Sequence, residues 1–328
     1  MKKKILSILV ALGLMVALTP TAVFAATEGA VGTTFSGNDT PDVLVECGAT
    51  LTPQSEATIN VTVTDADGLA DIASIVLKLY YDSDTTAATE VEFEAMTTAN
   101  AETLAYITWT AGGDFVLSEE TGSTWSMGSG TAPATLADPF VFKITPSKVA
   151  TEALNSGTAC WQIAALVTDD QSATGYGSDA SRAAMNWYGD ITVNTASADF
   201  GIEVPGTVFA DATVGNISMT YIANGAYDEK VKVATDAFTG GTGTVTVDVT
   251  DFNATEANEI AFMADDDATT ADSVGVDASG AVIDNSGTIT EETGDTVATN
   301  SLWLQISSGY SATGVKTGNI FFVIASGS

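Results

Sequence analysis

Aspartates at the ends of two apolar segments are the residues of this sequence best suited to bind a ligand. Asp65, Asp67 and Asp71 follow the segment "TINVTVT", and Asp169 and Asp170 follow "CWQIAALVT". Calcium binds six to eight oxygens, mostly from carboxylates and carbonyls. If the two segments end at one pole of the fold, these aspartates would converge on one cation.

A second interpretation of the same residues is a simple turn. Asp-Ala-Asp-Gly suits a turn in which an aspartate accepts from nearby backbone N–H groups and Gly68 adopts a positive φ. The EF-hand spacing is incomplete, because no glutamate stands at the twelfth position counted from Asp65. The same two interpretations, solvated loop or metal site, apply to the run Asp265, Asp266 and Asp267.

The chain contains no histidine. This excludes Ser-His-Asp and Cys-His nucleophile systems and removes the commonest zinc ligand. Neither a dinucleotide-binding glycine motif nor a P-loop occurs. A glycosidase needs only two carboxylates, but the tryptophans are scattered along expected strands instead of gathering around a cleft. We therefore expect no enzymatic activity.

The two cysteines, Cys47 and Cys160, lie at the end and at the start of expected strands. An even number of cysteines in an exported protein predicts a disulfide between them. The alternative is a pair of buried thiols.

The N-terminus has the pattern of a secretory signal peptide. Residues 1–25 contain three lysines, an apolar stretch and small residues before the expected cleavage site. The formal net charge of the whole chain is −32. Nucleic acids and anionic membranes bind basic patches, so we expect neither as a partner. We expect an exported protein with an acidic surface that keeps it in solution.

Alternating apolar and polar residues predict a first set of short strands. In 58–64, Ile59, Val61 and Val63 fall on one face, as a half-buried strand requires. The segments with this pattern are 42–47, 58–64, 74–81, 90–95, 103–109, 139–144 and 160–168. Residues 145–157 predict one or two helical turns. This strand content predicts an antiparallel β-sandwich over residues 41–182.

A second set of strands predicts another sandwich over residues 187–328. Its segments are 188–194, 198–204, 214–222, 229–235, 244–249, 258–264, 301–306 and 317–325. The last of these is apolar from Ile320 to Ile324, which predicts that both its faces are covered. Residues 26–40, rich in Gly and Thr, are expected to be a flexible leader.

The stretches "VTVTDADGLADIASIVLKLYY" and "CWQIAALVTDD" resemble the immunoglobulin-like and fibronectin-like modules of prokaryotic surface proteins. "TYIANGAYDEKVKVATDAF", "ADDDATTADSV" and "YSATGVKTGNIFFVIA" are similar to the C-terminal β-sandwiches of WxL-type and TasA-like secreted proteins. "SLWLQI" lacks a clear Trp-x-Leu pair. The resemblance implies two tandem antiparallel, immunoglobulin-like or jelly-roll-like domains that serve as an extracellular scaffold or adhesin.

The sequence as a whole predicts a non-enzymatic structural protein of the cell surface or extracellular matrix. Two alternatives stay open. A carbohydrate-binding or adhesive module would stack sugars on exposed aromatics such as Tyr80 and Tyr81, or Trp109 and Trp125. A self-assembling filament subunit would add residues from the leader 26–40 to the open strand edge of a neighbour. The expected partners are accordingly other surface proteins, glycans or copies of the chain.

Overall fold

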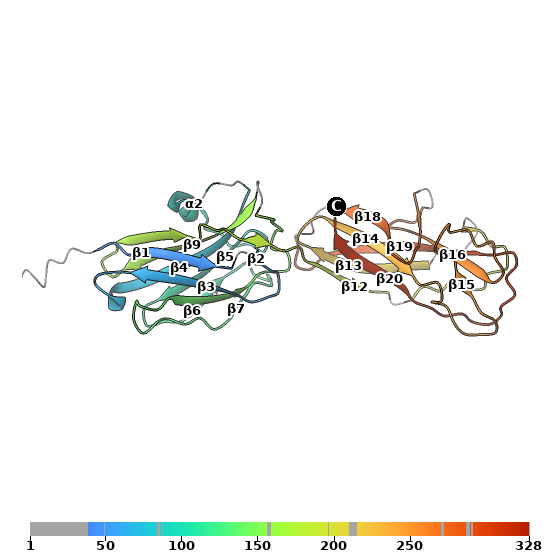
Figure 1. Cartoon of the computed structure of the whole chain (residues 1–328), viewed down its shortest axis with the longest axis horizontal. Coiled ribbons are helices and arrows are strands. Elements are labelled where there is room, and N and C mark those ends of the chain that lie inside the picture. The colour runs from blue at the N-terminus through green and yellow to red at the C-terminus, as the bar shows by residue number, and fades with distance from the viewer. Residues whose placement is uncertain are drawn as a thin grey trace, which may run out of the picture.

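The computed structural model describes residues 39–327 except 49, 84–85, 87, 156–158, 196, 210–214, 270–271, 287–288 and 290. Within these residues the fold is all-β with several sheets, which confirms the all-β part of the expected fold class. The strands form two lobes that lie end to end along the long axis of the molecule (Figure 1). The expected signal peptide and residues 26–38 of the expected leader lie outside the described residues.

The first lobe contains two antiparallel sheets, ordered β1-β3-β8-β7 and β10-β9-β4-β5-β6, and the parallel pair β11-β2. Its strands are β1 (Asp42–Cys47), β2 (Thr50–Leu51), β3 (Ala57–Thr64), β4 (Ile72–Asp82), β5 (Leu104–Thr110), β6 (Phe115–Ser118), β7 (Ser126–Met127), β8 (Phe140–Thr145), β9 (Cys160–Asp169), β10 (Thr174–Ser178) and β11 (Ala184–Met185). Two short helices, η1 (Leu69–Asp71) and α2 (Glu90–Ala95), connect strands.

The core of the first lobe is apolar. Ile59, Val61 and Val63 of β3 are fully buried, in agreement with the alternation in the sequence. Trp161 of β9 is completely buried in the same core, and its ring centroid lies 5.8 Å from that of Trp125. Full burial of a large apolar side chain contributes about 1.5–3 kcal/mol, so this core is the main source of the lobe's stability.

The edge strands β1 and β10 of the two sheets approach closely. A Cβ added at Gly177 would lie 2.3 Å from the carbonyl oxygen of Val43, and one at Gly175 would lie 1.8 Å from that of Pro41. Only glycine fits at these two positions of β10. The close approach shields strand edges that would otherwise be open to pairing with another chain.

The second lobe contains a six-stranded sheet, β12-β13-β19-β16-β15 with β17 paired to β16, and a three-stranded sheet, β18-β14-β20. Its strands are β12 (Gly189–Val193), β13 (Gly215–Ala223), β14 (Tyr227–Val233), β15 (Thr246–Val247), β16 (Glu259–Asp265), β17 (Val274–Gly275), β18 (Ala281–Ser286), β19 (Asp295–Ile306) and β20 (Ile320–Ser326). A separate cluster of buried apolar residues, including Phe262 and Val231, forms its core.

Asn224 joins the two lobes. This residue is 2% exposed, and its Nδ2 donates to the carbonyl oxygens of Ala150 (2.7 Å) and Asn186 (2.9 Å). Its Oδ1 accepts from the backbone N–H of Tyr188 at 2.6 Å. Because a buried amide satisfies three backbone groups at the junction, it fixes the connecting segment between the lobes.

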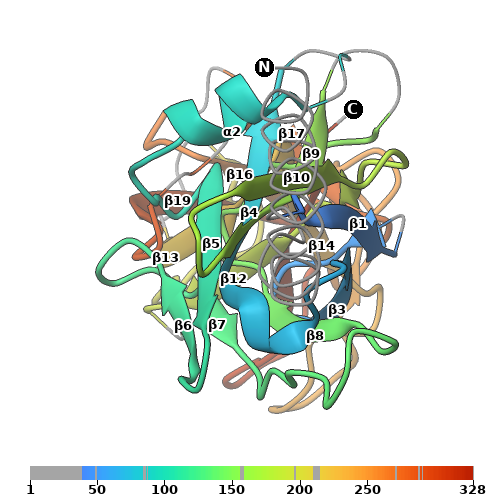
Figure 2. The same cartoon turned by 90° about the vertical axis from the view of Figure 1, so that its left-hand side faces the viewer.

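Residues 90–95 form helix α2, so the expected strand there is wrong. Thr89 and Glu92 make a capping box: the Thr89 side chain accepts from the Glu92 backbone N–H, and Glu92 accepts from that of Thr89. Phe93 then packs with Tyr80 and Leu104 on the outer face of the sheet. Figure 2 shows α2 beside β5 on this outer side of the lobe.

Three other local expectations are also wrong. The described part of 145–157 contains turns and no helix, and 198–204 contains no strand. Strand β20 lies at the edge of its sheet, and Phe321 is 51% exposed, so its two faces are not both covered. Among the described residues the longest helix, α2, has 6 residues, and none could span a bilayer.

Cys47 and Cys160 are not joined in a disulfide, which corrects the sequence expectation. Cys47 packs against the core between the sheets, as does Trp161. Successive strand residues point to opposite faces, so Cys160 lies on the face of β9 opposite to Trp161. The two thiols are therefore directed to different sides of the five-stranded sheet.

Candidate metal centre

Two strand ends of the first lobe meet at one pole. After β3 the chain turns through Asp65 to Gly68 and one 3-10 turn, and β4 then begins at Ile72. In the β4–β9 pairing, Ile72 lies opposite Asp169, and the backbone N–H of Asp170 donates to the carbonyl oxygen of Asp71 at 2.7 Å. The pairing register thus brings the last residues of β9 against the turn that follows β3.

Carboxylate oxygens of Asp65, Asp67 and Asp71 lie within 4.8 Å of one another. The Asp170 side chain lies within hydrogen-bonding range of Asp71, and the Asp169 carboxylate is near enough to act on it electrostatically. All five aspartates singled out in the sequence therefore lie at this pole. We call these five residues the polar-end cluster.

Three oxygens of the polar-end cluster are buried and have no hydrogen-bond donor among the described residues: Oδ2 of Asp65, of Asp71 and of Asp169. Asp71 is 7% exposed and Asp169 is 2% exposed. For Asp65 and Asp169 the other oxygen is used locally. Asp65 Oδ1 accepts from Asp67 N–H (2.7 Å), and Asp169 Oδ1 accepts from Ala173 N–H (2.7 Å). Buried polar atoms are normally hydrogen-bonded, so these three oxygens need a partner.

The neighbouring Asp170 side chain raises the proton affinity of Asp71. The adjacent Asp170 side chain, burial and the Asp169 charge raise the pKa of Asp71 to about 6, although a hydrogen bond with Gln171 acts in the opposite direction. Two carboxylates at this separation are stable only when a proton or a cation offsets their charge. The ionised cluster could therefore hold a positively charged ligand.

The turn interpretation and the metal interpretation are compatible in this geometry. Gly68 has φ 92° and ψ −179°, a conformation that is essentially restricted to glycine. The Asp65 carboxylate accepts the Asp67 N–H, as expected of an aspartate turn. The turn uses one oxygen of Asp65 and leaves the other directed into the cluster. Several carboxylate oxygens without nitrogen or sulfur ligands suit a hard cation such as Ca²⁺.

Sequence reasoning missed Gln171, whose side chain bonds Asp71. No feature of its residue type indicates this role. Its position directly after Asp169 and Asp170 is the only signal, and that signal has meaning only once the register of β4 and β9 is known.

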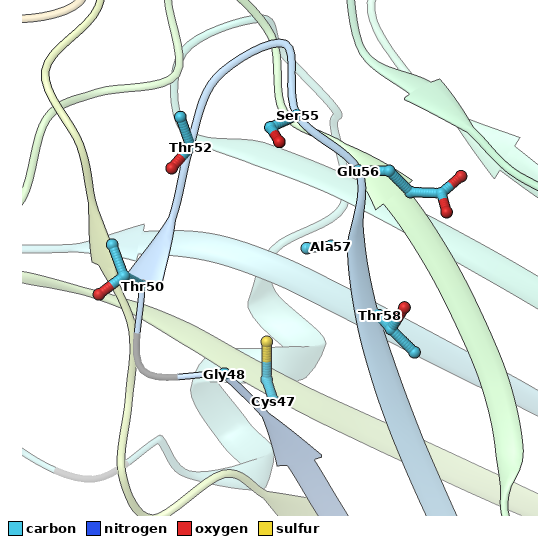
Figure 3. Close-up of a pocket in the computed structure, with 8 residues that line it drawn as sticks. All are labelled: Cys47, Gly48, Thr50, Thr52, Ser55, Glu56, Ala57 and Thr58. Atoms are coloured by element: carbon cyan, nitrogen blue, oxygen red, sulfur yellow. The ribbon is translucent and has the colours of Figure 1, made fainter.

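A groove of about 190 Å³ beside Cys47 is lined by Gly48, Thr50, Thr52, Ser55, Glu56, Ala57 and Thr58 (Figure 3). Glu56 points away from the thiol and pairs with Lys143 at 3.0 Å. Burial and the nearby Asp179 carboxylate raise the pKa of the Cys47 thiol to about 11. A thiol that stays protonated is a poor nucleophile, so this groove does not activate Cys47.

A larger groove of about 570 Å³ lies along β1, β3 and β10. Its acidic lining residues, Asp42 and Glu90, are both exposed, and its single aromatic residue is Tyr176. The groove therefore has two exposed carboxylates and one aromatic residue, and the set of aromatic residues expected around a glycosidase cleft is not part of its lining.

The aromatic residues considered for sugar stacking are in the core. Tyr80 is 1%, Trp109 6% and Trp125 2% exposed. Trp109 packs on Phe140 with ring centroids 4.7 Å apart. Tyr81 is half-buried and lies edge-on to Trp161. These residues stabilise the fold and form no exposed platform for a carbohydrate.

Comparison with known proteins adds no family to this description. No protein-family model matches the chain, and no curated protein matches it.

Proposed function

We propose that this chain is a non-enzymatic structural protein of the cell surface or extracellular matrix, and that Ca²⁺ binding at the polar-end cluster stabilises its first lobe. One observation carries the calcium role: buried oxygens of Asp65, Asp71 and Asp169 have no donor among the described residues, and the three residues lie at one pole. Calcium sites of extracellular modules have Kd values of about 10⁻⁴–10⁻³ M. A partly exposed carboxylate cluster fits that range.

The proposed architecture is a signal peptide, residues 1–25, a leader, residues 26–40, and two tandem antiparallel β-sandwich domains of immunoglobulin-like or jelly-roll-like type, residues 41–182 and 187–328. The division into domains is supported by the two separate cores and by the fact that no described sheet has strands from both lobes. Export is supported by the N-terminal sequence pattern.

The non-enzymatic role is supported by the lack of histidine and by the chemistry of the two grooves. The Cys47 thiol stays protonated although the Asp179 carboxylate is near it, and Asp42 and Glu90 are both exposed in a groove that one aromatic residue lines. The folded chain would act by holding its strand edges and loops in a fixed arrangement.

The calcium role is tested by thermal unfolding of the secreted protein in EDTA and in millimolar CaCl₂. Binding at 100 times Kd contributes about 2.7 kcal/mol, so we expect Tm to rise by several degrees. Asp71→Asn should reduce the rise, whereas the control Asp236→Asn, which removes an exposed acid outside the cluster, should leave it unchanged. An equal rise in wild type and Asp71→Asn, or no rise in wild type, would reject the role.

The location is tested separately by cell fractionation and by protease treatment of intact cells. We expect the processed chain in the medium or in the envelope fraction, where external protease degrades it. Full-length, unprocessed protein in the cytoplasm would reject a surface role, whatever the result with calcium.

Self-assembly is a second candidate, favoured by the open edge of the second lobe. β20 ends its sheet, and half of Phe321 is exposed on it. An apolar edge strand can accept a strand from another copy, such as one formed by the leader 26–40. We expect the mature protein to form multimers that dissociate when residues 26–40 are deleted, and a monomeric mature protein on size exclusion would exclude this candidate.

A further inference from the structure

A second group of acidic oxygens converges in the other lobe. β16 ends at Asp265, and the chain returns as β17, which pairs Met263 with Gly275. Carboxylate oxygens of Asp265, Asp267 and Asp272 lie within 4.8 Å of one another. Asp267 follows β16 and Asp272 precedes β17. Both of these acids are exposed, whereas Asp265 is buried. We call these three residues the hairpin cluster.

The buried member of the hairpin cluster has an oxygen without a partner. Asp265 is 4% exposed, and its Oδ2 is buried with no donor among the described residues. Its Oδ1 accepts weakly from the Asp267 N–H at 3.4 Å. The nearest group to Asp265 is another acid, because the Asp266 side chain lies within hydrogen-bonding range. Burial, followed by Asp266, raises the pKa of Asp265 to about 6.

No basic side chain offsets this charge in the described part of the chain. The ion pairs described there lie elsewhere: Lys143–Glu56, Lys148–Asp190 and Lys230–Asp228. A buried carboxylate beside like charges is costly unless it is protonated or bound to a cation. A cation held between the three carboxylates would offset this charge and give the buried Oδ2 of Asp265 a partner.

We propose that Asp265, Asp267 and Asp272 form a second Ca²⁺ site, in the second lobe. Calcium–oxygen distances are ~2.3–2.6 Å, so two ligands on opposite sides of one ion lie about 4.8 Å apart. The separations in the hairpin cluster are within this limit. Water completes the coordination sphere, because Asp267 and Asp272 are exposed. Mg²⁺ fits less well, since it requires near-ideal octahedral geometry at shorter distances.

The two acidic clusters share one local design. Asp65 directly follows β3, and Asp265 is the last residue of β16. The Oδ1 atom of each accepts a hydrogen bond from the backbone N–H two residues later. The Oδ2 atom of each is buried without a donor among the described residues. The spacing is Asp65, Asp67 and Asp71 in the first lobe and Asp265, Asp267 and Asp272 in the second. The hairpin cluster lacks a counterpart of Asp169 and Asp170 from a second strand end, so we expect it to bind Ca²⁺ more weakly.

The number of sites is the decisive measurement. Calcium titration of the EDTA-treated, full-length mature protein by isothermal calorimetry should give two sites. Asp265→Asn should leave only the tighter site, and Asp71→Asn only the weaker one. The control Asp236→Asn should keep both. A single site in wild type that survives Asp265→Asn would overturn this proposal alone. A single site that survives Asp71→Asn and is lost in Asp265→Asn would overturn the calcium role proposed above and leave this proposal standing.

A luminescence experiment identifies the second site directly. Trp303 lies opposite Met263, two residues before Asp265 in β16. Tb³⁺ bound at the hairpin cluster should therefore be sensitised by Trp303, and the signal should fall at least severalfold in Trp303→Phe and on addition of excess Ca²⁺. If Asp265→Asn does not fold, Asp267→Asn and Asp272→Asn replace it, because both side chains are exposed. Unchanged Tb³⁺ binding in both of these variants would also overturn the proposal.

Discussion

The space between the sheets is filled differently in the two lobes. The first lobe buries apolar side chains such as Trp161 and Phe140 there. The second lobe adds a polar group at the centre: Asn300 Nδ2 donates to Tyr221 Oη at 2.6 Å and to Glu229 Oε1. Glu229, Asn300 and Tyr221 are completely buried, yet Glu229 Oε2 and Asn300 Oδ1 have no partner among the described residues.

This difference separates two sources of stability. An apolar core contributes in proportion to the area it buries and is nearly independent of pH. Burial, together with the charges of Asp284 and Asp266, raises the pKa of Glu229 to about 7, although hydrogen bonds with Tyr221 and Asn300 oppose the shift. The stability of the second lobe should therefore depend on pH through a group in its core. In the first lobe, the pH dependence of stability should come from the polar-end cluster alone.

The largest expected effect is on the apolar cores. Trp161→Ala should destabilise the first lobe by about 3–5 kcal/mol, because it leaves a large cavity. Phe262→Ala, at a 1% exposed position of β16, is the matched change in the second lobe. Hydrogen exchange measured by mass spectrometry should show faster exchange only in the lobe that carries the substitution. Equal acceleration in both lobes would show that they unfold as one unit.

The next effect concerns the buried carboxyl of the second lobe. The folded-state pKa of Glu229 is raised from 4.5 to about 7. The contribution of protonated Glu229 to the stability of the fold is therefore fully present below about pH 4.5 and is lost as pH rises through 7. Glu229→Gln should raise the unfolding free energy at pH 8 by about 1–3 kcal/mol, since Gln Nε2 can donate to Asn300 Oδ1. Urea denaturation at pH 5 and pH 8 measures this, with the exposed Glu256→Gln as control. A variant less stable than wild type at pH 8 would contradict the prediction.

A substitution at the junction tests whether each lobe stays folded when the connection between the lobes is weakened. Asn224→Ala removes a buried amide that satisfies three backbone groups and should cost about 1–3 kcal/mol. Limited proteolysis should then cut between 176 and 188 faster, with both cores still protected. Loss of protection throughout one lobe would mean that Asn224 supports that lobe's core and not only the junction.

The smallest effect belongs to α2, which has no α-helical counterpart among the described residues of the second lobe. Thr89→Ala removes the capping box and should cost about 1 kcal/mol. Hydrogen exchange should rise in 88–96 alone, and the exposed Thr98→Ala should leave it unchanged. A global loss of stability would show that α2 is needed for the whole sheet.

Errors of sequence interpretation occurred where two signals competed. "EVEFEA" alternates like a strand, but Thr89 and Glu92 have the spacing of a capping box. The segment forms helix α2 with that capping box. Glu229 was detectable in principle, because it shares the inward face of β14 with Val231 and Val233. A charged residue on an apolar face is a signal of a buried ionisable group.

The sequence alone determined most of the long strands, the turn at Gly68 and the acids that follow β3 and β16, because period-two alternation and backbone preferences act over a few residues. Only the tertiary structure decided which acids meet. Asp170 lies against Asp71 because β4 pairs with β9 in one register, and Cys160 points away from Cys47 because a shift of one residue reverses the face of a strand. Both depend on contacts between residues distant in the chain, which local preferences do not encode.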